Sequence, residues 1–259
     1  MNDVDNGKPP DFTDLGCRQC LQGEPLGFDF SMAFQPIVDR TSNRVFAYEA
    51  LARGLNGESA GTVFDRVNAD NQYRFDQVCR VKAIKLAADL GIECYLSINF
   101  MPNAVYTPAS CIRTTLACAD EFEFPRERII FEITETERIN RLNHLKNIVE
   151  HYRQIGFLTA IDDFGSGFAG LNLLAEFQTD IVKLDMGLVR GIDQNTARQA
   201  IVRGILQAAE EMGIRVIAEG VETGAELAFL EAEGVRLFQG FLFARPGFEK
   251  LPPADLAPD

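Results

Sequence analysis

The sequence predicts an α/β protein, a modified (β/α)8 TIM-type barrel in which the first two strands form an antiparallel hairpin. Three observations predict this fold class. The chain has 259 residues, of which 46% are hydrophobic, so it can bury a large core. From residue 30 onward, short apolar runs alternate with amphipathic helical patterns, which is typical of parallel β-α-β units. The first two apolar runs, in contrast, are joined by a short polar turn.

The hairpin follows from the spacing of the first two predicted strands, residues 33–39 and 45–51. A parallel crossover connection needs about a dozen residues or more, and the polar turn between these strands is far shorter. The two strands are therefore expected to run antiparallel, and the barrel to depart from regular alternation at its start.

The rest of the chain alternates as a barrel requires. Further strands are expected at residues 95–100, 128–134, 157–163, 180–185, 215–220 and 235–243. Helices are expected within residues 61–90, at 109–119, before Gly156, before Gly213 and from 223 onward, the fourth with Ile201, Ile205, Ala209 and Met212 on its buried stripe. About eight strands in this length fit a closed barrel better than an open doubly wound sheet.

The chain is expected to divide into three parts. Residues 1–28 form a flexible acidic N-terminal segment, residues 29–250 the barrel domain, and residues 251–259 a Pro-rich tail. The polar N-terminus does not resemble a secretory signal, and no run of about 18 apolar residues predicts a membrane segment. We therefore expect a cytoplasmic protein.

Charge and cysteine content restrict the possible partners. The formal net charge of −13 argues against a nucleic acid polymer or an anionic membrane as the partner. Of six cysteines, only Cys17 and Cys20 form a CxxC pair, so a four-cysteine zinc site is poorly supported. Reduced, independent thiols are expected, and a redox pair or an intermolecular metal site at the N-terminus stays an alternative.

Polar residues stand where most of the predicted strands end. They are Glu49, Asn99, Glu132, Asp162, Asp163, Lys183, Glu219 and Gln239. In a barrel the carboxyl ends of the strands meet at one mouth, so these side chains should converge. Clustered carboxylates repel and need cations, and oxygen ligands without His or Cys favour Mg²⁺ or Mn²⁺. The pattern therefore predicts a metal-dependent active site.

Two features refine this prediction. The adjacent Asp162 and Asp163 suit two divalent cations about 3.5–4 Å apart, the arrangement used for phosphoryl transfer to water. Lys183 faces inward with Ile181 and has two interpretations: a base whose ammonium form is disfavoured near metals, or a structural counter-charge to the carboxylates.

Seven motifs in order resemble those of the EAL domain, a family of cyclic-di-GMP phosphodiesterases with a modified barrel of this kind. The motifs are "YEALAR" (48–53), "SINFMP" (97–102), "FEITE" (131–135), "IDDFGSGFAGL" (161–171), "DIVKLD" (180–185), "IAEGVET" (217–223) and "QGFLFARP" (239–246). The resemblance covers about residues 30–250 and implies hydrolysis of cyclic-di-GMP to linear pGpG by water activated between two metals.

The resemblance also implies a role for each matching residue. The implied ligands of one metal are Glu49, Asn99, Glu132 and Asp162, and those of the second are Asp162, Asp163 and Glu219. The implied catalytic residues around the attacking water are Lys183, Glu219 and Gln239. Gln35, Arg53 and Glu222 are implied on the substrate side. Glu135 would anchor the loop after Asp163 and link metal binding to a homodimer.

Two alternatives remain beside the phosphodiesterase. One is a cyclic-di-GMP receptor that binds without cleaving, although no metal or base position is missing here. The other is an unrelated Mg²⁺-dependent barrel that uses lysine as a base on a carbon acid, for which no second acid or base is evident. Departures from the usual motifs, such as Ala52, Gly54 and Ser166, alter flanking positions rather than the predicted ligands.

Overall fold

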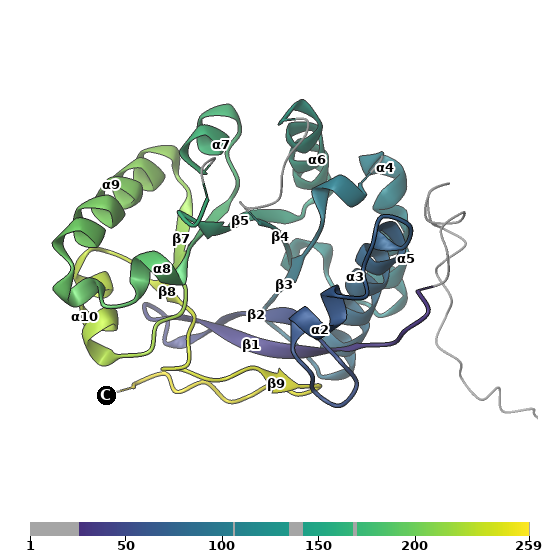
Figure 1. The fold of residues 1–259 in the computed structure, drawn as a ribbon, viewed down its shortest axis with the longest axis horizontal. Helices are drawn as coiled ribbons and strands as arrows, with labels where there is room; N and C mark the ends of the chain where they lie inside the picture. The colour runs from purple at the N-terminus through teal and green to yellow at the C-terminus, as the bar shows by residue number, and fades with distance from the viewer. Residues whose placement is uncertain (1–25, 106, 135–141, 168–169, 259) are drawn as a thin grey trace, which may run out of the picture.

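The computed structural model describes residues 26–105, 107–134, 142–167 and 170–258. Its strands join into one sheet in the order β2-β3-β4-β5-β6-β7-β8-β1-β9, with a further pairing of β1 with β2 that closes the barrel. The helices lie outside this barrel (Figure 1). The strands are β1 (Ser31–Asp39), β2 (Arg44–Arg53), β3 (Tyr95–Asn99), β4 (Ile129–Thr134), β5 (Leu158–Phe164), β6 (Ile181–Leu184), β7 (Arg215–Ala218), β8 (Leu237–Phe238) and β9 (Gly247–Phe248).

The predicted hairpin is confirmed. β1 pairs antiparallel with β2, from Ser31 opposite Arg53 to Asp39 opposite Arg44, whereas neighbouring strands from β2 to β8 run parallel. β1 also pairs antiparallel with β8 through Val38 and Asp39. Its earlier residues Ala33 and Phe34 pair antiparallel with the short β9, which the sequence did not predict. Because β1 runs antiparallel to β2, the short turn between them can connect the first two strands of the barrel without a crossover helix.

The helices alternate with the strands as expected. The α-helices are α2 (Ala60–Phe64), α3 (Gln72–Asp89), α4 (Pro108–Cys111), α5 (Arg113–Glu121), α6 (Leu142–Ile155), α7 (Gly170–Glu176), α8 (Met186–Val189), α9 (Thr196–Met212) and α10 (Gly224–Ala232), and the 3₁₀ turns are η2 (Pro102–Ala104), η3 (Arg126–Arg128) and η4 (Ile192–Gln194). α9 is capped by Asn195, whose side chain accepts two backbone N–H groups, and by Gly213, which has a φ of 68°.

The predicted buried stripe of α9 was wrong at both ends. Ile201 is 52% exposed and Met212 is 37% exposed, whereas Val202, Ile205 and Ala209 are buried. Because Ile201 and Val202 are both apolar and adjacent, the 3.6-residue pattern admits either as the start of the stripe.

The last strand was predicted too long. β8 covers only Leu237 and Phe238, because the chain turns at Gly240, whose carbonyl accepts the N–H groups of Phe243 and Ala244. Phe243 is nevertheless buried. An apolar run can fill the core from a turn, and periodicity alone does not distinguish this from a strand.

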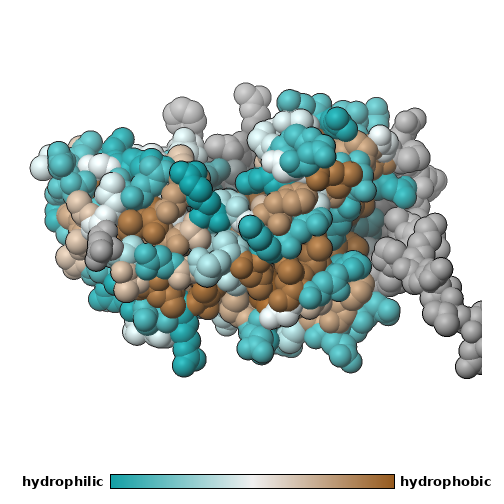
Figure 2. All heavy atoms as spheres, turned by 90° about the horizontal axis from the view of Figure 1, so that it is seen from below, coloured by the Kyte–Doolittle hydropathy of each residue, from teal (hydrophilic) through white to brown (hydrophobic). Residues whose placement is uncertain are grey.

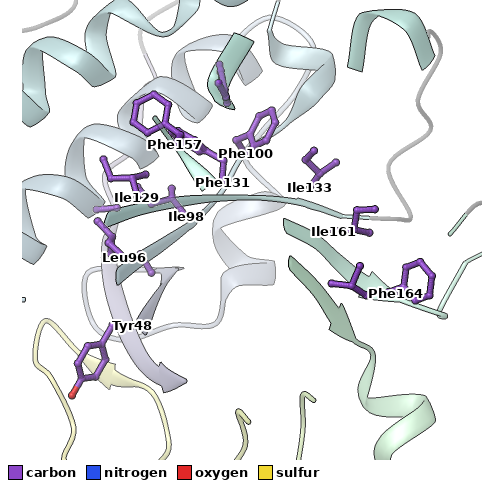
Figure 3. Close-up of a cluster of buried hydrophobic side chains, with 14 of the residues drawn as sticks. Tyr48, Leu96, Ile98, Phe100, Ile129, Phe131, Ile133, Phe157, Ile161 and Phe164 are labelled. Atoms are coloured by element: carbon purple, nitrogen blue, oxygen red, sulfur yellow. The ribbon is translucent and has the colours of Figure 1, made fainter. Parts of the chain in front are cut away.

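The hydrophobic core has two layers. The inner layer fills the barrel and consists of Ile37, Ala47, Ile130, Ala160, Ile181, Ile217 and Leu237, all buried. The outer layer packs strands against helices, and Figure 3 shows part of it, where Phe100, Phe131 and Phe157 gather on the outside of β4. The Phe131 ring lies 5.6 Å from that of Phe100 and 5.1 Å from that of Phe157, both edge-on.

The segment after residue 250 packs on the barrel. Leu251, Ala254 and Leu256 contact the core, and the Asp255 N–H donates to the Phe243 carbonyl over 2.9 Å. The face of β1 and β9 carries hydrophobic patches separated by hydrophilic side chains (Figure 2). Among the described residues, no helix has both the length and the apolar character that a membrane span requires.

The close approach of Gly240 to Val221 gives a stability prediction. A Cβ at Gly240 would lie 2.0 Å from the Val221 carbonyl oxygen, so Gly240→Ala must push apart the two turns that follow β7 and β8. We expect a loss of about 1–3 kcal/mol in the free energy of unfolding, or roughly 5 °C in Tm, measured by thermal denaturation.

The matched control is Gly61→Ala in the exposed first turn of α2, where a Cβ would meet only Ser59 at 3.7 Å. This substitution should leave Tm unchanged or raise it slightly, since alanine costs less backbone entropy than glycine. Equal Tm values for the two variants would contradict the steric argument.

Candidate active site

The predicted site residues stand in one layer of the barrel, directly above the inner core. Most lie two positions from a residue of that layer, as with Ala47 and Glu49 on β2 or Ile181 and Lys183 on β6, whereas Asn99 and Asp163 do not. Side chains two apart on a strand point to the same side, so the residues that follow the apolar layer also point into the barrel. On the reversed β1 the order inverts, and Gln35 precedes Ile37.

Lys183 lies at the centre of this layer, with no exposed surface. Its Nζ atom lies 2.7 Å from Glu219 Oε1, 2.9 Å from Glu132 Oε2, 2.9 Å from Asp162 Oδ1 and 3.4 Å from Glu49 Oε2. One ammonium group therefore contacts four carboxylates from four strand ends. The structure thus brings four of the six predicted metal ligands into contact with Lys183.

Hydrogen bonds orient the carboxylates of this layer. Ser97 Oγ donates to Glu132 Oε1 over 2.5 Å, while Asn99 Nδ2 donates to Glu49 Oε1 over 2.9 Å. Gln239 Nε2 donates to the other oxygen of Glu49 over 2.7 Å. Both oxygens of Glu49 are therefore held, and the carbonyl oxygen of Asn99 is left as the atom that can ligate a cation.

Gln35 belongs to the same network. Its Nε2 donates to the Ala244 carbonyl over 3.1 Å, and its Oε1 lies 3.4 Å from Gln239 Nε2. The Gln35 side chain is therefore held between the Ala244 carbonyl and Gln239, and it helps to orient Gln239.

The charges of the site change one another's pKa values. Burial lowers the pKa of Lys183, but Asp162, Glu132, Glu219 and Glu49 outweigh it and hold that pKa well above its usual value. Burial raises the pKa of Glu132 and Glu219, and the neighbouring carboxylates raise both further. Without cations, the lysine thus stays charged and balances the carboxylates of this layer. We call these carboxylates the acidic layer; they are Glu49, Glu132, Asp162, Asp163 and Glu219.

Asp163 is placed differently from the other carboxylates. The pairing of β5 with β6 shifts register between Ile161 and Phe164, and Asp163 takes a left-handed φ of 55°, which Asp tolerates better than most residues. This irregularity brings adjacent carboxylates to one site, although strand alternation would separate them. Burial, Asp162 and Asp185 raise the pKa of Asp163 to about 6.

The donor set fits two divalent cations. Carboxylate oxygens of Glu49, Glu132 and Asp162 lie within 4.8 Å of one another, and so do those of Asp162, Asp163 and Glu219. Asp162 is common to both groups. Its buried Oδ1 has no hydrogen-bond partner, since the 2.9 Å contact with Lys183 is an ion pair without hydrogen-bond geometry. These all-oxygen ligands are of the kind that hard cations such as Mg²⁺ or Mn²⁺ prefer, and the Asp162 oxygen without a hydrogen bond is free to ligate one.

A cavity of about 280 Å³ opens from this layer toward α8. Its lining includes Arg53, Glu222, Arg190, Asp185 and Phe241. Sequence reasoning missed the last three, which lie in turns beyond the strand ends, although Asp185 closes the quoted "DIVKLD" motif. Arg190 binds both carboxylate oxygens of Glu222 over 2.5 Å, so Glu222 orients an arginine at the cavity wall.

A second cavity of about 440 Å³ borders the acidic layer on the side of α2 and α3. Its walls are apolar, with Phe64, Phe75 and Met101, and its inner end is formed by metal-ligand candidates. The two cavities share Glu49 and Asp163, so the carboxylates lie between a charged and an apolar compartment.

A larger cavity of about 750 Å³ lies near the other ends of β7 and β8, lined by Phe46, Arg203 and Arg215 among others. None of the predicted site residues lines it, so its size does not mark it as the site of chemistry. Glu135, the predicted loop anchor, and the Cys17–Cys20 pair lie outside the described residues.

Comparison with known proteins agrees with this geometry. Residues 21–246 match the family model described as EAL domain. A standalone EAL protein of Vibrio cholerae O395, solved with c-di-GMP bound, is 58% identical with a TM-score of 0.88, over 90% of this chain and 98% of that chain. A manganese/cyclic-di-GMP complex of Klebsiella pneumoniae BlrP1 is 37% identical with a TM-score of 0.82, over 89% and 58%.

Among curated proteins, the cyclic di-GMP phosphodiesterase PdeR of Escherichia coli K12 is 34% identical over 168 residues, which are 64% of this chain and 25% of PdeR. The chain spans about half or less of the length of the curated relatives that it matches. The family match covers most of the chain and includes every residue of the acidic layer. The chain therefore belongs to the EAL-domain family.

Proposed function

We propose that this protein is a metal-dependent phosphodiesterase that hydrolyses cyclic-di-GMP to linear pGpG. The observation that carries the proposal is the acidic layer itself. It consists of two clusters of three carboxylates that share Asp162, with Lys183 at their centre. The ligands named in the Vibrio and Klebsiella structures and the activity named for PdeR support the same substrate.

The residues that would hold the cations follow from the two groups. Glu49, Asn99, Glu132 and Asp162 would hold one, and Asp162, Asp163 and Glu219 the other. When bound, two Mg²⁺ or Mn²⁺ ions lower the pKa of water and neutralise charge on a phosphate. The manganese in the BlrP1 complex supports this choice of metal.

Lys183 would accept the proton of the attacking water. The carboxylates raise its pKa in the arrangement described above, whereas burial lowers it. Cations held by the same carboxylates would compensate those charges, and burial would then dominate the pKa of Lys183. Its Nζ atom can then accept a proton, so the two interpretations of Lys183 describe the site without and with its metals.

Other residues of this chain would orient the substrate. Arg53, at the end of β2, and Arg190, held by Glu222, supply positive charge in the cavity beside the acidic layer, where an anionic phosphodiester would lie. Gln239 holds Glu49 and lines the same cavity, from which it can contact the water or the phosphate. Glu135 is proposed to anchor the loop after Asp163 and to link it to a homodimer.

One prediction from this proposal concerns turnover. Lys183→Ala and Glu49→Ala should each lower the hydrolysis of cyclic-di-GMP at least about 100-fold, because one removes the proton acceptor and the other a ligand. Purified protein is incubated with cyclic-di-GMP and Mg²⁺ or Mn²⁺, and pGpG is resolved by chromatography.

The control for this assay is Glu150→Ala, an exposed carboxylate on α6, which should keep normal turnover. A fully active Glu49→Ala variant would show that the ligand assignment is wrong. If the unsubstituted protein binds cyclic-di-GMP but forms no pGpG with either metal, the receptor alternative is correct.

A second prediction concerns pH and stability without metal. The folded protein raises the pKa of Asp163 to about 6, so the contribution of this carboxyl to the free energy of unfolding falls as pH rises from about 4 to 6 and stays lower above. In EDTA, Asp163→Asn should therefore raise Tm at pH 8 by roughly 3 °C, after allowance for solvent screening, and have no effect below about pH 4.

Excess Mg²⁺ should reverse this order at pH 8, since the second cation stabilises the protein that keeps the Asp163 carboxylate more than the variant that lacks it. Thermal denaturation with and without EDTA measures both effects. Asn also tolerates a left-handed φ, so the backbone at this position does not confound the comparison. A lower Tm for the variant in EDTA at pH 8 would refute the electrostatic account.

A further inference from the structure

A buried ion pair lies in α3, outside the acidic layer. Asp76 and Arg80 are each only 2% exposed, and Asp76 Oδ2 lies 2.6 Å from Arg80 Nη2. Arg80 also donates to Thr115 of α5 over 3.3 Å. Replacing a buried ion pair by apolar residues of similar size is often neutral or stabilising, so stability alone does not explain a pair at this position.

The second oxygen of Asp76 has a different partner. Asp76 Oδ1 accepts the backbone N–H of Met101 over 2.9 Å. Met101 follows the end of β3 by two residues, and that end is Asn99, a predicted metal ligand whose side chain donates to Glu49. The carboxylate thus holds the chain at the point where it leaves the site.

The residue between them is fixed independently. The Phe100 N–H donates to the Glu132 carbonyl over 3.1 Å, and its ring packs 5.6 Å from Phe131 and 5.6 Å from Tyr152, as Figure 3 shows for Phe131. Phe100 therefore fixes one side of the turn, and Asp76 fixes the next peptide. Without Asp76, the Met101 N–H would lose its hydrogen-bond partner. The turn after Asn99 would then be held by Phe100 without the contact to α3.

We propose that Asp76, oriented by Arg80, is a positioning residue for the metal ligand Asn99. The inference rests on the proposed function, because it assumes that Asn99 ligates a cation. Asp76 lines the apolar cavity beside the acidic layer but belongs to neither carboxylate cluster, and it acts through the Met101 peptide. Residues that orient ligands in this indirect way typically change metal affinity about 10- to 100-fold when they are replaced.

Two double variants separate this role from general stabilisation. Asp76→Asn with Arg80→Met removes both charges but keeps an amide oxygen that can accept the Met101 N–H. Asp76→Leu with Arg80→Met removes the charges and the acceptor. Neither variant leaves a buried charge unpaired, and both lose the Arg80 contact with Thr115 equally.

The measurements are Mn²⁺ affinity by titration calorimetry and hydrogen exchange of the Met101 amide, both on the full chain. The leucine variant should bind Mn²⁺ about tenfold more weakly than the asparagine variant and exchange the Met101 amide faster. The asparagine variant should match the unsubstituted protein within about threefold.

The outcomes distinguish the two proposals. Equal Mn²⁺ affinities in the two variants, with binding by the unsubstituted protein intact, overturn the positioning role alone. No Mn²⁺ binding by the unsubstituted protein overturns the metal-dependent function, and the positioning role with it. Equal exchange rates at Met101 show that Asp76 does not anchor that peptide, and they overturn the inference whatever the affinities.

Discussion

Repulsion among buried carboxylates is the constraint on which the rest of this structure depends. The barrel mouth brings Glu49, Glu132, Asp162 and Glu219 within contact of one ammonium group, in a region that excludes most water. Burial and mutual repulsion raise the pKa of Glu132 and Glu219, so the acidic layer is costly unless positive charge accompanies it. Lys183 supplies one such charge, and the geometry leaves room for cations to supply the remainder.

The two-layer barrel makes this concentration of charge possible. An apolar layer closes the barrel below the site, and each strand that enters it carries a polar side chain two residues farther along. The same strands that provide the hydrophobic driving force therefore fix the positions of the ligands. Antiparallel β1 completes the ring and contributes Gln35 from the opposite chain direction.

Much of this arrangement was predictable from the sequence, and the misses have physical causes. Apolar runs ending in Glu, Asn, Asp or Lys identify strand ends, and the topology of a barrel makes strand ends converge. Arg190 and Phe241 could not be found in this way, since they lie in turns whose course is set by tertiary contacts. The left-handed Asp163 and the short β8 likewise depend on a register shift and on a turn at Gly240, which strand periodicity does not encode.

The central ammonium group has a consequence for how the protein acquires its metals. A site of unpaired carboxylates would fold only together with its ions, and metal binding would then carry the free energy of folding. Here Lys183 acts as an internal counter-ion, so the barrel can fold first and present a preformed site afterwards. Cation binding would then not have to supply the free energy of folding, and the metals available in the surroundings would decide which ion occupies the site.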